Sequence, residues 1–184
     1  IELTSSIALS DQVTIDSGKT IILDMNGETL SIGFSDSSKN LIVNNGTLTI
    51  TGDGTFDATE ATSYKGFINN YGTLTVENGT FQIADKAMTV HLRNQDGGKA
   101  VINGGTFSGG ATIVRSFEGS NTTITGGSFT NSVYPAVDVN GETLITGGIF
   151  TNTSCSRCDS QNWGYTVRSG VDNDPDAKLR EAVL

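Results

Sequence analysis

Hydrophobic and polar residues alternate with a period of two in short runs along the chain. In Thr47–Thr51, Leu48 and Ile50 point one way and the threonines point the other, as in a strand with one buried face. Similar runs return four times, and their last aliphatic residues are separated by 26, 26, 22 and 21 positions. These residues are Ile50, Val76, Ile102, Ile124 and Ile145. Repetition at this period predicts a repeat protein whose units bury each other's apolar faces.

A glycine-containing turn and a phenylalanine follow each run, as in Asn103-Gly104-Gly105-Thr106-Phe107. The phenylalanines are Phe56, Phe81, Phe107, Phe129 and Phe150. A further apolar run precedes each unit, for example at residues 41–43 and 113–114. Three short strands in each unit, joined by Asn-Gly and Gly-Gly turns, predict a triangular coil. Because stacked parallel strands lie about 4.8 Å apart, we expect the aliphatic residues and the phenylalanines to form two ladders.

The sequence therefore predicts an all-β fold, a single-stranded parallel β-helix of about seven coils in residues 1–152. Right-handed coiling is expected because crossovers between parallel strands favour that hand. Residues 153–184 are predicted to form a C-terminal cap or linker, with a loop and a short helix at residues 177–184. The helix is expected to cover an open coil end. If that end belongs to the next subunit, the contact gives head-to-tail self-association, whereas contact with its own end gives a capped monomer.

The segment Gly18-Lys19-Thr20-Ile21-Ile22-Leu23-Asp24-Met25-Asn26-Gly27-Glu28-Thr29-Leu30 precedes these glycine-phenylalanine repeats. Together they resemble the β-helical domains of Gram-positive bacterial surface proteins and adhesins. They are also similar, more distantly, to the pectate-lyase-like superfamily. The resemblance covers about residues 13–152 and implies the β-helix fold and an extracellular location, at a cell surface or secreted. It does not choose an activity, because adhesins, stalks and enzymes share this repeat.

Composition narrows the classes of partner. Apolar residues make up 35% of the 184 residues, and the chain has 23 glycines and two prolines, which suits a thin solenoid with many turns. The net charge of -9 argues against a nucleic-acid partner, because a surface that follows phosphates must be basic. No run approaches the roughly 20 apolar residues of a membrane-spanning helix.

The two cysteines, Cys155 and Cys158, lie in a Cys-Ser-Arg-Cys sequence near the C-terminus. One such pair supplies only two metal ligands, so we expect neither a zinc site nor another metal or cofactor. We predict a local disulfide in preference to two reduced thiols. A disulfide implies an oxidising compartment.

A polysaccharide lyase on this scaffold would need calcium-binding carboxylates and a proton-accepting Arg or Lys on one exposed sheet. The candidates are Lys86, His91, Arg93, Arg115, Glu118 and Asp138. Arg93 and Arg115 are expected to be neighbours in successive coils, yet no coil places several acids beside them. We therefore predict no catalytic residue and a structural or adhesive module that is not an enzyme. A polysaccharide-active enzyme or a glycan-binding domain is the alternative.

The aromatic residues expected to be exposed are Tyr64, Tyr71, Tyr134, Trp163 and Tyr165. Flat rings are platforms for glycans or protein partners, although Trp163 and Tyr165 fit equally well in a cap over the last coil. The outward threonines also raise the question of ice binding, which needs a regular threonine array. Lys99 and Glu142 interrupt the rows, which favours an ordinary β-branched strand surface.

Overall fold

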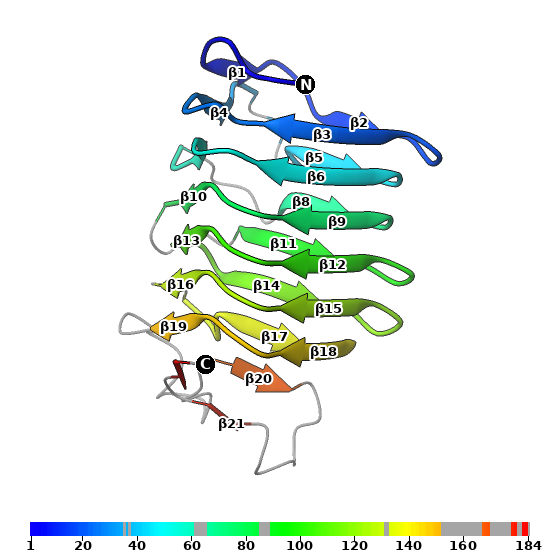
Figure 1. Cartoon of the computed structure of the whole chain (residues 1–184), viewed down its shortest axis with the longest axis vertical. Coiled ribbons are helices and arrows are strands. Elements are labelled where there is room, and N and C mark those ends of the chain that lie inside the picture. The colour runs from blue at the N-terminus through cyan, green and yellow to red at the C-terminus, as the bar shows by residue number, and fades with distance from the viewer. Residues whose placement is uncertain are drawn as a thin grey trace.

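The protein is described by a computed structural model, which defines residues 1–34, 36, 38–60, 66–84, 89–130, 133–151, 167–169, 178–179 and 182–183. Strands stack along one axis into three sheets and form a right-handed parallel β-helix, as predicted (Figure 1). The repeating unit is a triplet of strands, one for each sheet, joined by tight turns. A right-handed crossover returns the chain to the next parallel strand, as the handedness rule requires.

Sheet A contains the alternating runs from which the repeat is recognised. Its strands are β3 (Thr20–Asp24), β6 (Thr47–Thr51), β9 (Thr73–Val76), β12 (Lys99–Ile102), β15 (Asn121–Ile124) and β18 (Glu142–Ile145).

Sheet B contains the phenylalanine strands. They are β1 (Ile7–Leu9), β4 (Thr29–Ile32), β7 (Thr55–Ala58), β10 (Thr80–Ile83), β13 (Thr106–Ser108), β16 (Ser128–Thr130), β19 (Ile149–Thr151) and β22 (Ala182–Val183).

Sheet C contains the strands that begin each triplet. They are β2 (Val13–Ile15), β5 (Ile42–Asn44), β8 (Gly66–Asn70), β11 (Val90–Asn94), β14 (Thr112–Ser116), β17 (Val137–Val139), β20 (Val167–Ser169) and β21 (Lys178–Leu179).

The number of coils is smaller than the expected seven. Sheet A has six strands, so the chain makes about five full turns from β3 to β18. The N-terminal residues account for part of the difference, because they supply β1 and an isolated bridge between Glu2 and Asp24 instead of a whole coil. Alternation of apolar residues near the end of the solenoid therefore indicates a strand, but it does not show that all three strands of a coil are present.

The helix expected at residues 177–184 is wrong for the four residues of this range that the structure describes. They form β21 and β22, which pair antiparallel with β20 and β19. The physical reason is the open sheet edge, whose unpaired N–H and C=O groups are satisfied when another strand is added. The described part of the chain contains no helix. It therefore offers no helix long and apolar enough to cross a bilayer.

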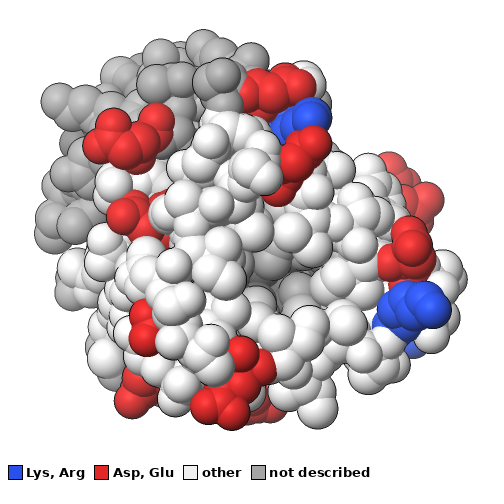
Figure 2. All heavy atoms as spheres, turned by 90° about the horizontal axis from the view of Figure 1, so that it is seen from above, with Lys and Arg blue, Asp and Glu red and all other residues white. Residues whose placement is uncertain are grey.

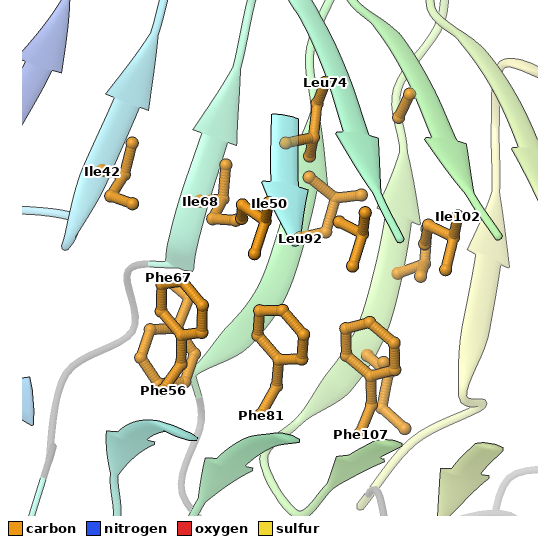
Figure 3. Packing of buried hydrophobic residues seen from close by; sticks show 14 of the residues in the cluster. Ile42, Ile50, Phe56, Phe67, Ile68, Leu74, Phe81, Leu92, Ile102 and Phe107 are labelled. Carbon is orange, nitrogen blue, oxygen red and sulfur yellow. The ribbon is translucent and has the colours of Figure 1, made fainter. Parts of the chain in front are cut away.

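The two predicted ladders form the core (Figure 3). The sheet B phenylalanines are buried and stack with ring centroids 4.7, 4.5, 5.1 and 4.6 Å apart from Phe56 to Phe150. The sheet A aliphatic residues are in register from Ile50 to Ile145, and only Ile145, in the last strand, is half-buried. Each coil thus buries apolar area against the coils before and after it.

A polar ladder lies inside the same core, where sheet C turns into sheet A. The Asn44 amide donates to Asn70 Oδ1 over 2.7 Å, and the Asn70 amide donates to Asn94 Oδ1 over 2.8 Å. Asn94 then donates over 2.9 Å to Thr122 Oγ1, which lies in β15 of the next coil. All three asparagines are fully buried. They hold one coil over the next because each amide finds a partner in the coil above or below.

The repeated Gly-Gly pair sets the close spacing of the turns. The second glycine has a φ of +97° at Gly105 and +102° at Gly127, a region that favours glycine. A Cβ at Gly127 would lie 3.1 Å from the Gly105 carbonyl oxygen in the coil before. The glycine of the motif is therefore required both by its backbone conformation and by the stacking of coils.

Candidate functional site

One row of outward-facing residues crosses the middle of sheet C. The register pairs Asn69 with Arg93, Arg93 with Arg115, and Arg115 with Asp138. Arg115 is exposed and the other three are half-buried, while the preceding residues Ile68, Leu92 and Val114 are buried in the core. The neighbouring positions of Arg93 and Arg115, expected from the repeat, are confirmed.

A second row lies two residues further along, where the sheet C strands end. It consists of Tyr71, Gln95 and Phe117, stacked by backbone hydrogen bonds from Gln95 to Asn70 and from Phe117 to Asn94, both 2.9 Å. The Tyr71 side chain is exposed. We call the two rows the arginine–aromatic patch; it comprises Asn69, Tyr71, Arg93, Gln95, Arg115, Phe117 and Asp138.

Side-chain contacts hold the two rows together. Gln95 Nε2 donates to Asn69 Oδ1 over 2.6 Å, and Asn69 Nδ2 donates to the Tyr71 hydroxyl over 3.3 Å. The guanidinium carbons of Arg93 and Arg115 lie 5.4 and 5.2 Å from the centroid of the Phe117 ring. A cation within about 6 Å of an aromatic centroid is attracted by the ring. The patch is therefore a connected arrangement of side chains on a rigid sheet.

The two arginines differ in their electrostatic environment. Arg115 Nε lies 3.3 Å from Asp138 Oδ2 and forms an ion pair, in which the Asp138 side chain is mostly buried. Arg93 forms no ion pair or hydrogen bond with any described residue, and its Nε atom is buried without a partner. Burial lowers the pKa of Arg93, and the charge of Arg115 lowers this pKa further. Arginine nevertheless stays protonated at neutral pH, so Arg93 carries a charge that no described acidic residue neutralises.

The stem of Arg93 is accommodated by a glycine in the preceding coil. A Cβ at Gly66 would lie 3.1 Å from both Cγ and Cδ of Arg93. Gly66 is the first residue of β8 and pairs with Val90, so the absence of a side chain there leaves room for the arginine. The guanidinium is thereby held over the sheet instead of extending freely into solvent.

His91, considered above as a candidate base, is a core residue. Its side chain is buried, and Nε2 lies 3.0 Å from the Ser108 carbonyl oxygen and 3.3 Å from that of Gly109. Burial lowers the pKa of His91 to about 4, although its contacts with the two carbonyl oxygens oppose the shift. The ring packs against Phe67 and Phe107. The structure thus separates His91 from the outward arginines.

Two other residues singled out in the sequence, Glu118 and Tyr134, lie outside this patch. Glu118 is exposed in the turn after Phe117, and the half-buried Tyr134 precedes β17, at the other end of the sheet C strands from Tyr71. Lys86, Tyr64, Trp163, Tyr165 and the expected disulfide cysteines, Cys155 and Cys158, lie outside the described residues. In the part of the chain that is described, no three His, Cys, Asp or Glu side chains are grouped to hold a metal ion.

The sequence also contained a signal for the residues that were missed. Asn69, Gln95 and Phe117 belong to the patch but were not expected to do so. Phe117 follows Arg115 by two residues, as Gln95 follows Arg93 and Tyr71 follows Asn69. Extending the register one position beyond the end of each strand would have placed all of them on one surface.

A second feature is the N-terminal end of the solenoid, where the core is open. A cavity of about 400 Å³ lies among the first coils and is lined mainly by aliphatic side chains, including those of Ile7, Leu9, Ile21 and Leu30. Figure 2 views this end and shows an uncharged hollow with charged side chains around its periphery. The cavity is a continuation of the core and not a polar site.

No family model, curated protein or solved structure matches this chain. The β-helix fold rests on the structure itself.

Proposed function

We propose that the chain is a noncatalytic structural and adhesive module of an extracellular protein, displayed on a bacterial surface or on a particle that meets one. The observation that supports this proposal best is the arginine–aromatic patch. It combines a cation that has no counter-ion among the described residues, an exposed aromatic ring and amide groups on the face of a sheet, and side chains of these kinds recognise ligands by direct contact.

The scaffold supports adhesion because it is rigid at the position of the patch. β11 and β14 lie inside sheet C with parallel partners on both sides, and the stacked phenylalanines and asparagines lie beneath them. Residues on such a sheet keep their spacing when they meet a ligand, so little conformational entropy is lost on binding.

Adhesion is tested with beads that carry the full chain at controlled density. We expect them to adhere to bacterial cells or to immobilised cell-surface polysaccharides more strongly than beads that carry bovine serum albumin, which is also acidic. Absence of adhesion across the whole panel would contradict the proposal. In parallel, incubation with soluble acidic polysaccharides should give no unsaturated, ultraviolet-absorbing products. Their formation would favour a polysaccharide-active enzyme.

The open N-terminal end favours self-association as a second property. Its cavity exposes core side chains, and the final strand of sheet A in another copy, β18, has an unpaired edge among the described strands. A second copy whose first coil docks on β18 of its neighbour would continue sheet A in parallel, whereas sheets B and C end in the antiparallel strands β22 and β21. Such a head-to-tail contact does not close and produces a filament or an array.

Sedimentation at increasing protein concentration tests self-association. Ile7→Lys places a charge in the cavity wall and should shift the chain to a monomer. Ile22→Lys is the matched control, because Ile22 is exposed on the outward face of sheet A and does not line the cavity. A parent protein that stays monomeric at all concentrations would rule out this contact.

A further inference from the structure

We propose that the arginine–aromatic patch binds the carboxylate groups of an acidic polysaccharide, with Arg93 as the main anchor. This inference rests on the proposed adhesive function and specifies the ligand class of the same surface. It is carried by the contrast between two neighbouring arginines: Arg115 has a counter-ion, and Arg93 has none in the described part of the chain.

Arg93 needs an anion that the described protein does not supply. Its charge is half-buried beside the charge of Arg115, and Asp138 is positioned on the far side of Arg115 in the register. A ligand carboxylate at Arg93 would add the missing opposite charge and accept hydrogen bonds from the guanidinium. Such charge-assisted bonds are stronger than neutral ones, and the planar guanidinium is matched to a carboxylate. Because the net charge of the chain is -9, attraction of an anionic ligand has to come from short-range contact with this cation and not from the overall field of the protein.

The residues around Arg93 favour a sugar over a polypeptide. The exposed Tyr71 ring offers a flat apolar platform for a sugar ring, and Gln95 and Asn69 offer amide groups to hydroxyls. One recurring way to bind an extended peptide, by contrast, is to add it to the free edge of a sheet. Here β8, β11 and β14 are each paired on both sides, so the patch presents a sheet face with no edge to extend.

The direct test is isothermal titration of the full chain with a defined galacturonic acid oligomer, compared with the same oligomer after reduction of its carboxyl groups. We expect saturable binding of the acidic form and at least about tenfold weaker binding of the reduced form, because charge-assisted hydrogen bonds are lost. Binding of the acidic form should also weaken as salt concentration rises. Equal binding of both forms would overturn the proposal.

Variants assign the binding to this patch. Arg93→Gln should weaken binding of the acidic oligomer about tenfold, and Arg93→Lys should recover part of the loss, because it restores charge without the planar fork. Lys99→Gln is the matched control, since it removes the same charge from the exposed side of sheet A and should leave affinity unchanged. Circular dichroism and thermal melts of each variant show whether the fold is retained. If Arg93→Gln unfolds, the folded Arg93→Lys variant replaces it in the test. Weaker binding by Arg93→Lys than by the parent assigns the site to Arg93, and equal binding overturns the assignment.

A third variant tests the sugar-binding aspect. Tyr71→Ala should weaken binding of the acidic oligomer several-fold while leaving its salt dependence unchanged, because it removes the aromatic platform and no charge. Titration with poly-glutamate, an acidic polypeptide, tests whether the patch distinguishes a sugar from a peptide. If poly-glutamate bound as tightly as the sugar oligomer and with the same dependence on Arg93, the ligand class would be wrong.

The two proposals fail in different ways. Beads that adhere to cells whether or not Arg93 is replaced would overturn the ligand assignment and keep the adhesive function. Beads that adhere to nothing, together with a soluble chain that binds the acidic oligomer through Arg93, would overturn adhesion and keep the site.

Discussion

Sheets A and C are built by the same coils but present different outward faces. The outward rows of sheet A run Thr47, Thr73, Lys99, Asn121, Glu142 and Thr49, Thr75, Val101, Thr123, Leu144, as the repeat predicts. β-Branched residues recur there because they suit any exposed strand. The corresponding part of sheet C changes from Asn69 to Arg93, Arg115 and Asp138. The repeated residues maintain the fold, whereas the non-repeated ones distinguish one surface from another.

The threonine face also shows why repetition alone is weak evidence of function. Lys99 and Glu142 interrupt one row, and Leu144 is an exposed residue in the other. A regular threonine lattice is therefore not formed on sheet A. Sheet C, although less regular, has the more connected set of side-chain contacts.

The largest expected effect on stability lies in the hydrophobic core, to which both sheets contribute buried aliphatic side chains. Ile102→Ala in sheet A and Leu92→Ala in sheet C should each lower the free energy of unfolding by about 2 to 5 kcal/mol, because both side chains are buried and leave cavities. Val101→Ala, on the outward side next to Ile102, is the matched control and should cost less than about 1 kcal/mol. Equal melting temperatures for the parent and both core variants would show that these strands are assigned the wrong inward face.

A pH-dependent effect should distinguish sheet C from sheet A. Burial lowers the pKa of His91 from 6.5 to about 4 in the folded protein, so folding favours the neutral ring. This contribution is complete above about pH 6.5 and is lost as pH falls through 4, because the unfolded chain binds the proton first. The resulting loss in the free energy of unfolding approaches about 3 kcal/mol.

Denaturant titrations between pH 7 and pH 4 measure this loss. His91→Ile is the matched variant, because Ile113 is buried at the corresponding position of the next coil. It should remove the part of the pH dependence that His91 causes, while the acidic groups continue to contribute theirs. If the free energy of unfolding of this variant depended on pH as in the parent, His91 would not be the source of the loss.

A smaller effect on stability should distinguish the buried polar ladder from the outward face of sheet C. Asn70→Ala should lower the free energy of unfolding by about 1 to 3 kcal/mol, because the buried side chains of Asn44 and Asn94 each lose the hydrogen bond that they form with Asn70. Asn69→Ala removes the neighbouring outward amide and should cost less, since water can replace its contacts. Chemical denaturation of both variants makes the comparison, and a larger loss for Asn69→Ala would reverse the assignment of the two faces.

The smallest stability change is expected at the ion pair of the patch. Asp138→Asn should cost less than about 1 kcal/mol, because Arg115 is substantially exposed and solvent screens the pair. Its effect on binding should be clearer. The variant frees the charge of Arg115 and should tighten binding of the acidic oligomer, which titration calorimetry measures. Weaker binding with an intact fold would indicate that Asp138 itself contacts the ligand.

The sequence by itself determined the β-helix, the inward ladders and the neighbouring positions of Arg93 and Arg115. It could do so because stacking in register converts a sequence repeat directly into spatial contact. The residues Ile50 to Ile145 and Phe56 to Phe150 show this most directly.

Tertiary structure alone decided the features that depend on where a strand bends or ends. His91 is buried because sheet C brings two successive side chains, His91 and Leu92, into the core, which simple alternation does not predict. The edge of the last coil recruits strands where local sequence favours a helix. The electrostatic environment of Arg93 likewise depends on distances between coils, because only the folded solenoid places Asp138 next to Arg115 and leaves Arg93 without a counter-ion among the described residues.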